Sequence, residues 1–230
     1  MAAALSYIIL FNVSKRKNHG EILRSAAAMG VSEVAIVGAT KLLLMGSHGA
    51  ASHLAFVHFR TLAEAVTYFK QVRFARIAGI EITPSAASVF DRPFHQATAF
   101  MIGNEGTGLS AEQLAACDEF VYIPQYSNAT ASLNVNAACA LVLAHFAAWA
   151  GFAETRRGGE GGLGKFEVVA PPSCVPHSGI GPRQMKTRLA DGTLASANNA
   201  SASDCVTSEC EETMLQNLFD DASCVDTVDS

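Results

Sequence analysis

Residues 98–110 of this 230-residue chain read Thr-Ala-Phe-Met-Ile-Gly-Asn-Glu-Gly-Thr-Gly-Leu-Ser. The first five are apolar or β-branched and suit a buried parallel strand. The segment from Gly103 to Gly108 holds three glycines, which permit a tight turn and a close approach of backbone to a ligand. Ser110 then opens a short helix, with Gln113 placed for a capping box. This succession of strand, glycine loop and helix predicts one unit of a layered α/β fold.

The same alternation continues on both sides of this unit. Further strands are expected at 7–11, 33–37, 77–82 and 119–123, and helices at 19–29, 61–69 and 131–149. Thr61 is a candidate N-cap, and the last helix is so apolar that we expect it to be buried. We predict an α/β fold with a mainly parallel sheet, whose ligands bind beyond the carboxyl ends of its strands. Functional residues are therefore expected in the loops after Phe11, Ile102 and Ile123.

Composition divides the chain near residue 152. Residues 1–150 carry 10 Lys and Arg against 9 Asp and Glu, whereas residues 151–230 carry 6 against 12. The second part is rich in Gly, Pro, Ser and Asn, and such a segment buries too little apolar surface to offset its ordering entropy. We expect a folded domain over 1–152 and a low-complexity, acidic, disordered tail over 153–230.

Cysteine and apolar patterns indicate the compartment. No run of 18 apolar residues occurs, so no membrane span is expected, and the apolar start lacks the basic segment of a secretory signal. The six cysteines form no CxxC pair, which predicts reduced thiols in an intracellular, cytoplasmic protein, with nucleus or organelle left open. Cys117 and Cys139 lie in apolar contexts and are expected to be core thiols.

No metal site is expected, because His48, His53 and His58 lack a further ligand at suitable spacing.

The polar loops admit several interpretations. The glycine loop is compatible with a tight turn that has no function. Phosphate binding competes with that interpretation, but neither the P-loop nor the dinucleotide pattern is present, and Glu105 would repel a phosphate. The loop from Pro124 to Asn136 is polar beside an apolar helix, which is costly unless its groups bind each other or a ligand.

Three blocks in a fixed order carry a resemblance to a known family. They are NHGEILRSAAAMG at 18–30, IGNEGTGLS at 102–110, and the segment from Ile123-Pro124 through Ser132-Leu133-Asn134-Val135. Together they resemble motifs 1, 2 and 3 of the SpoU (TrmH-like) branch of the SPOUT RNA methyltransferases, over about residues 5–150. Residues 46–59, with 122–126 and 149–152, look most like a eukaryotic-type subgroup.

The resemblance implies a fold, a cofactor and a reaction. It implies a deep C-terminal trefoil knot formed by the second and third blocks, S-adenosylmethionine bound in that knot, and a homodimer that completes the active site across its interface. The implied reaction transfers a methyl group to a ribose 2′-hydroxyl of tRNA or rRNA. The residues that match donor-binding positions are Gly103, Ile123 and Leu133, together with Asn104 and Gly108. Arg24 matches the catalytic arginine, and the polar residues around it are Asn18, Glu105, Ser132 and Asn134.

The chemistry of an arginine constrains the expected role of Arg24. A guanidinium is always protonated in proteins, so we expect a clamp for phosphate or for a developing alkoxide rather than a simple base. Gln125 and Ser127 depart from the family pattern, where many relatives have methionine and glycine, and this departure bears on donor affinity.

The low positive charge of residues 1–150 leaves two alternative functions open. The balance over 1–150 is only +1, which is low for an RNA-binding protein. Phosphate contacts would then depend on dimerisation and on Lys15, Arg16, Lys17, Arg73, Arg76 and Arg92. One alternative is a catalytically inactive relative that serves as an RNA-binding or scaffold protein. The other is an unrelated α/β nucleotide-binding enzyme.

Overall fold

The computed structural model describes residues 4–13, 16–38, 46–158 and 164–168. The strands in these ranges are β1 Ser6–Leu10, β2 Glu33–Val37, β3 Ala55–Phe59, β4 Arg76–Ile80, β5 Ala87–Ser88, β6 Thr98–Ile102 and β7 Glu119–Tyr122. The helices are α1 Arg16–Ala28, α2 Leu62–Gln71, α3 Ala111–Ala116 and α4 Val135–Ala150, with short 3-10 turns η1 Ala50–His53 and η2 Val89–Asp91. The strands form one sheet in the order β3-β2-β1-β6-β4-β7-β5, and every neighbouring pair is parallel.

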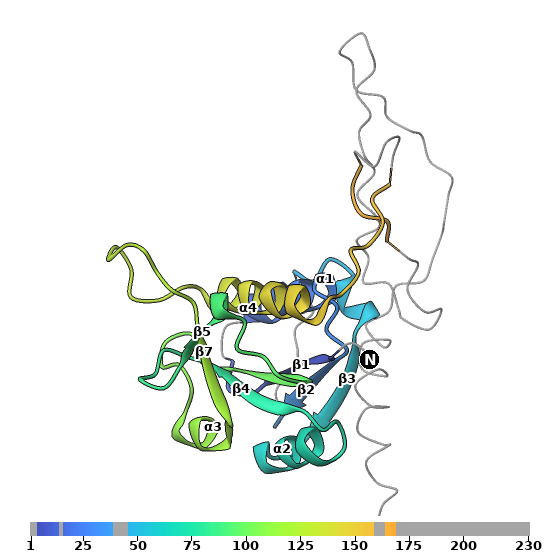
Figure 1. The fold of residues 1–230 in the computed structure, drawn as a ribbon. Helices are drawn as coiled ribbons and strands as arrows, with labels where there is room; N and C mark the ends of the chain where they lie inside the picture. Colours follow the sequence, from blue (N-terminus) through green and yellow to red (C-terminus); the bar gives the residue numbers. More distant parts are fainter. Residues whose placement is uncertain (1–3, 14–15, 39–45, 159–163, 169–230) are drawn as a thin grey trace, which may run out of the picture. The chain divides into compact units, whose positions relative to one another are not determined.

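Helices cover both faces of this sheet (Figure 1). Helices α1 and α4 lie on one face, and α2 and α3 lie on the other. In β1, Ile8 and Leu10 pack on the α1 and α4 side, whereas Tyr7 and Ile9 pack on the α2 and α3 side, because successive side chains of a strand point to opposite faces. The predicted α/β fold with a parallel sheet is confirmed.

Local sequence signals set several element boundaries. Strands β2 and β6 have the predicted bounds. Thr61 caps α2 and Ser110 caps α3, each in a complete capping box with the residue three positions later. These reciprocal bonds satisfy backbone N–H groups that have no partner inside the helix, so the predicted helix starts are confirmed.

Helix α4 differs from the prediction in its start. It begins at Val135 rather than at residue 131. The Asn134 side chain accepts a hydrogen bond from the Asn136 N–H at 2.9 Å and so acts as the N-cap. The residues from 123 to 134 therefore form one long loop after β7.

Helix α4 is buried as expected, but only along one side. Phe146 is fully buried among the aromatic side chains Phe94, Phe100 and Trp149. Leu141, on the opposite side of the helix, is 40% exposed. A helix that covers one face of a sheet buries only the stripe that touches the sheet, and apolar composition alone did not distinguish the two sides.

Strands β3 and β5 were not expected from the sequence. Strand β3 is an edge strand whose five residues all pair with β2, and the polar His58 interrupts its apolar pattern. The His58 ring donates a hydrogen bond to the Gly38 carbonyl at 2.8 Å. Strand β5 has two residues and pairs only with β7, so its existence depends on a strand far along the chain.

The second half of the chain is described in part. Of the predicted tail, residues 159–163 and 169–230 lie outside the described residues. In the part of the predicted tail that the structure describes, Arg157 and Phe166 form an isolated antiparallel bridge. Among the residues that the structure describes, no helix combines the length and the apolar composition needed to cross a membrane.

Candidate active site at the carboxyl edge of the sheet

Three loops meet beyond the carboxyl ends of the central strands. They follow β1, β6 and β7. The loops after β6 and β7 contain the second and third blocks, and the first block lies mostly in α1, which follows the loop after β1. The Asn104 side chain donates to the Asn12 carbonyl at 3.1 Å and so joins the loop after β6 to the loop after β1. The ends of neighbouring parallel strands thus bring together segments that are about ninety residues apart in sequence.

The loop after β6 is closed on itself by backbone bonds. Asn104 and Gly108 exchange two N–H to carbonyl bonds of 2.9 Å. The Asn104 side-chain oxygen also accepts from the N–H groups of Gly106 at 2.9 Å and Thr107 at 3.3 Å. A Cβ atom at Gly103 would lie 2.5 Å from the Gly108 carbonyl carbon, so only glycine fits there. Gly108 has a φ of +68°, which also favours glycine.

A cavity of about 300 Å³ opens beside this loop. Its walls come from the ends of β4, β6 and β7 and from both polar loops. All the residues expected to bind the donor line it, namely Gly103, Asn104, Gly108, Ile123 and Leu133. Part of the wall is apolar and comes from Ile80, Ile102 and Val121, whereas polar groups of the backbone and side chains line the remainder. Its size lies at the lower end of the range for small-molecule sites.

A buried asparagine links the first block to the other two. Asn18 is 4% exposed. Its Nδ2 donates to Glu105 Oε1 at 2.7 Å, and its Oδ1 accepts from Asn134 Nδ2 at 3.4 Å. Nearby, the Ser25 hydroxyl donates to Asn136 Oδ1 at 2.8 Å and ties α1 to α4. These bonds place Asn18, Glu105 and Asn134 in one network at the rim of the cavity.

Two of the polar residues expected near the donor line the cavity itself. Glu105 and Ser132 both contribute to its wall. The Thr130 hydroxyl bonds to the backbone of Ser132, donating to its carbonyl at 2.9 Å and accepting from its N–H at 3.4 Å. Neither Asn18 nor Asn134 is part of the wall. Asn18 is joined to it by the bond to Glu105, and Asn134 lies in the chain between the lining residues Leu133 and Val135.

Arg24 lies apart from this network within the single chain. It is an exposed residue on α1 and does not line the cavity. Its neighbour Ser25 makes the contact to α4. The structure thus brings together four of the five expected catalytic residues and leaves the arginine facing outward.

Sequence reasoning missed Glu81, which lines the same cavity. It directly follows β4, whose carboxyl end lies between those of β6 and β7. The strand expected at 77–82 includes Glu81, whereas β4 ends at Ile80 and leaves Glu81 in the loop that follows. A carboxylate immediately after a buried strand was the signal that would have found it.

Other titratable groups do not extend the site. Burial raises the pKa of the Cys139 thiol to about 12, and burial, followed by the charge of Asp118, raises the pKa of Cys117 to about 12. Cys139 is fully buried and is confirmed as a core thiol, whereas Cys117 is half-buried. In the described part of the chain, no group of three or more His, Cys, Asp or Glu could hold a metal ion.

The arginines expected to assist RNA binding lie in different places. Arg73 pairs with Glu33 at 2.6 Å and Arg76 pairs with Glu119 at 2.8 Å. Both pairs lie at the amino ends of the strands, opposite the cavity, so these two arginines are poor candidates for contacts near the site. Arg92 is exposed after η2. Lys15 lies outside the described residues.

Comparison with known families decides what the three converging blocks represent. A family model described as the SpoU rRNA Methylase family matches residues 6–144, from the start of β1 into α4. The chain belongs to this family. The match contains every loop that lines the cavity.

Two curated relatives of this SpoU family protein are bacterial. The 23S rRNA (guanosine-2′-O-)-methyltransferase RlmB of Acinetobacter baylyi is 29% identical over 141 residues, covering 59% of this chain and 56% of the relative. The tRNA (guanosine(18)-2′-O)-methyltransferase of Escherichia coli K12 is 30% identical over 139 residues, covering 59% and 60%. The chain thus matches less than two thirds of the length of either relative.

Solved structures of the SpoU family share the fold. The SpoU methyltransferase AviRb from Streptomyces viridochromogenes, in complex with the cofactor AdoMet, has a TM-score of 0.57 and 26% identity, covering 65% of this chain and 61% of that one. A structure described as an RNA 2′-O ribose methyltransferase has a TM-score of 0.53 and 28% identity, covering 64% and 56%.

Proposed function

We propose that this protein is an S-adenosylmethionine-dependent methyltransferase that acts on a ribose 2′-hydroxyl of tRNA or rRNA. One observation carries the proposal: the second and third family blocks line a single cavity, and Asn18 of the first block donates a hydrogen bond to Glu105 in its wall. Membership of the SpoU family and the activities named for the two relatives support the same reaction.

The cavity has the chemistry needed to hold the methyl donor. Apolar side chains, among them Ile80 and Ile123, provide a surface for a planar base. Both Gly103 and Gly108 line the cavity. A side chain at Gly103 would collide with the backbone of the loop, and one at Gly108 would collide with the Glu81 carboxylate. When bound, the donor supplies a methyl group on a positively charged sulfur. In the proposed reaction a ribose oxygen would take this methyl group and lose its hydroxyl proton, and S-adenosylhomocysteine would be left.

The residues of this chain would position the acceptor and assist loss of its proton. Arg24 is the proposed clamp for a phosphate or for the developing alkoxide, because a guanidinium keeps its charge. Glu105 and Asn18 fix the rim of the cavity. Ser132 and Asn134 border the place where the ribose would enter.

A homodimer would reconcile this role with the outward position of Arg24. Because Arg24 is exposed and outside its own cavity, we propose that it serves the cavity of a second copy. The exposed side of α4, with Leu141 40% exposed, is a surface that such a dimer would bury.

Two finer features belong to the same proposal. We propose that the segments at 103–110 and 123–134 form a trefoil knot; their shared cavity and the packing of α4 against β1 and β4 support it. We also propose a methyltransferase domain over 1–152 followed by a separate tail over 153–230.

The eukaryotic-type subgroup stays a prediction that the two bacterial relatives do not support. A cytoplasmic location likewise stays a prediction.

The deciding experiment maps ribose methylation across total RNA from cells with and without the protein. A position that loses its methyl group in the deletion, and regains it with the full chain but not with Arg24→Ala, is the expected result. Calorimetry on the purified protein gives the second readout. Absence of binding to S-adenosylmethionine and S-adenosylhomocysteine at millimolar concentration would refute the proposal, whereas donor binding with an unchanged methylation map would indicate an inactive scaffold.

A further inference from the structure

The carboxylate of Glu81 accepts hydrogen bonds from two backbone N–H groups, one just after β4 and one between the glycine loop and α3. Its Oε2 accepts from the Leu109 N–H at 2.9 Å, and its Oε1 accepts from the Ile82 N–H at 3.0 Å. The backbone N–H of Glu81 donates to the Val121 carbonyl at 3.1 Å. A Cβ atom at Gly108 would collide with Oε2, so the glycine loop is shaped around this carboxylate.

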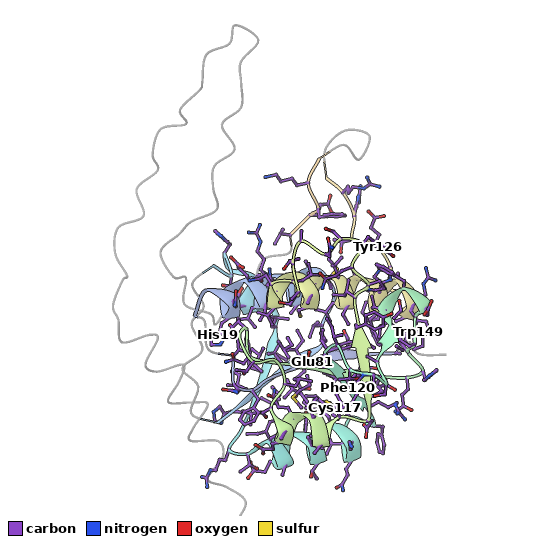
Figure 2. The ribbon with its side chains drawn as sticks, turned by 90° about the vertical axis from the view of Figure 1, so that its left-hand side faces the viewer. His19, Glu81, Cys117, Phe120, Tyr126 and Trp149 are labelled. Carbon is purple, nitrogen blue, oxygen red and sulfur yellow. The ribbon has the colours of Figure 1, made fainter. Side chains whose placement is uncertain are left out.

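Glu81 lies at the level of the sheet, above Phe120 and Cys117 in Figure 2. It lines the cavity together with Ile80 and Ile82. Among the described residues, no lysine or arginine forms an ion pair with it. A carboxylate placed in a partly apolar cavity without a cation is costly unless hydrogen-bond donors satisfy it.

The two backbone bonds do not exhaust the acceptor capacity of Glu81. Each carboxylate oxygen can accept about two hydrogen bonds, and each accepts one from the backbone here. Each oxygen therefore has room for one further hydrogen-bond donor. Two such donors, side by side, are provided by the adjacent 2′- and 3′-hydroxyls of a ribose. Acidic side chains bind ribose hydroxyls in this way in nucleotide sites at the carboxyl edge of other α/β sheets.

The second acid in the cavity wall is less suited to this role. Glu105 Oε1 already accepts a charge-assisted bond from the buried Asn18, and Glu105 takes part in a further interaction. Glu81 is therefore the carboxylate with capacity left for a ligand.

We infer that Glu81 binds the 2′- and 3′-hydroxyls of the ribose of the methyl donor. The inference rests on the proposed function, because it takes the cavity to be the donor site. It makes Glu81 a cofactor-binding residue that also holds the glycine loop through Leu109. The donor and the loop then stabilise each other through one carboxylate.

The test compares two ligands on two proteins by calorimetry. S-adenosylhomocysteine and its 2′,3′-dideoxy analogue are titrated into the full chain and into Glu81→Gln. We expect the analogue to bind the unaltered protein about tenfold or more weakly, the loss typical of a hydrogen bond to a charged group. In Glu81→Gln this penalty should fall below about threefold, because the acceptor pair is no longer a carboxylate.

Controls separate ligand binding from folding. Glu112→Gln alters an exposed glutamate of α3 outside the cavity and should keep the full penalty. Thermal unfolding without ligand tests whether Glu81→Gln folds. If it does not, the comparison of the two ligands on the unaltered protein still decides, because equal affinities would overturn the inference and leave donor binding intact. If neither ligand binds, the proposed function falls and the role of Glu81 with it.

Discussion

Asn18 Nδ2 lies 2.7 Å from Glu105 Oε1, although 87 positions separate the two residues in the chain. This bond joins the start of α1 to the glycine loop after β6. Asn18 is buried, so its amide depends on such partners, and the bond supports the rim of the cavity from inside the protein.

Asn18→Ala is expected to lower the free energy of unfolding by about 2 kcal/mol, since it removes the hydrogen bonds that the buried Asn18 side chain makes with Glu105 and Asn134. Urea unfolding of the full chain measures this loss. Asn128→Ala, in the exposed loop after β7, is the matched control and should change stability by less than about 0.5 kcal/mol. Equal stabilities of the two variants would show that the bond contributes nothing.

Two glycines of one loop give a matched pair of alanine variants. At Gly103 a methyl group would lie 2.5 Å from the Gly108 carbonyl carbon, whereas at Gly106 it would meet only the Asn104 side chain at 3.6 Å. We expect Gly103→Ala to weaken S-adenosylhomocysteine binding by about tenfold or more, because the loop must shift. Gly106→Ala should bind within about threefold of the unaltered protein. Calorimetry distinguishes the two, and identical affinities would refute the proposed place of the donor.

Gln113 connects α3 to two strand ends. Its Nε2 donates to the carbonyls of Ile102 at 3.1 Å and Phe11 at 3.3 Å, and the side chain is fully buried. Gln113→Leu should therefore lower the free energy of unfolding by about 2 kcal/mol. Gln71→Leu, at the exposed end of α2, is the control and should stay within about 0.5 kcal/mol. An unfolding midpoint unchanged in Gln113→Leu would count against this role.

Alkaline pH should destabilise the fold through Cys139. Burial raises the pKa of its thiol from 9.0 to about 12. The unfolded chain then loses the thiol proton at a lower pH than the folded chain does. This contribution to stability is complete below pH 9 and declines by about 1.4 kcal/mol per pH unit as the pH rises toward 12. Unfolding free energies measured from pH 8 to 11 should fall less steeply in Cys139→Ala, and parallel curves would contradict the expectation.

Mixed dimers test whether Arg24 acts on the cavity of a second copy. Arg24→Ala and Gly103→Ala are each expected to be inactive in transfer of labelled methyl to RNA. When mixed and allowed to exchange, they should recover about a quarter of the normal rate, because about half of the dimers are mixed and each mixed dimer keeps one intact site. No recovery after verified exchange would place the action of Arg24 within its own chain or remove it from the reaction.

Local patterns in the sequence were sufficient for much of the fold. Strands β2 and β6 are continuous apolar runs ended by glycine, and the caps Thr61 and Ser110 are marked by residues only three positions away. Each signal lies within its own element, so no knowledge of the remaining chain was needed. The five residues that the motifs predict to bind the donor lie together in one cavity.

Features that depend on distant partners were not predicted. Strand β5 exists because Ala87 and Ser88 pair with β7, more than thirty residues later. Glu81 became a candidate only when the structure placed the end of β4 between β6 and β7. The side of α4 that faces the sheet was also hidden, because both sides are apolar in sequence.

The position of β7 between β4 and β5 has a consequence for synthesis of the protein. A nascent chain that has emerged only through α3 already carries the glycine loop, yet it lacks β7, which forms one wall of the cavity and pairs with β5. Affinity for the proposed methyl donor can therefore arise only after the ribosome has released the residues of α4. Ligand-dependent protection from proteolysis would therefore report completed translation of this region.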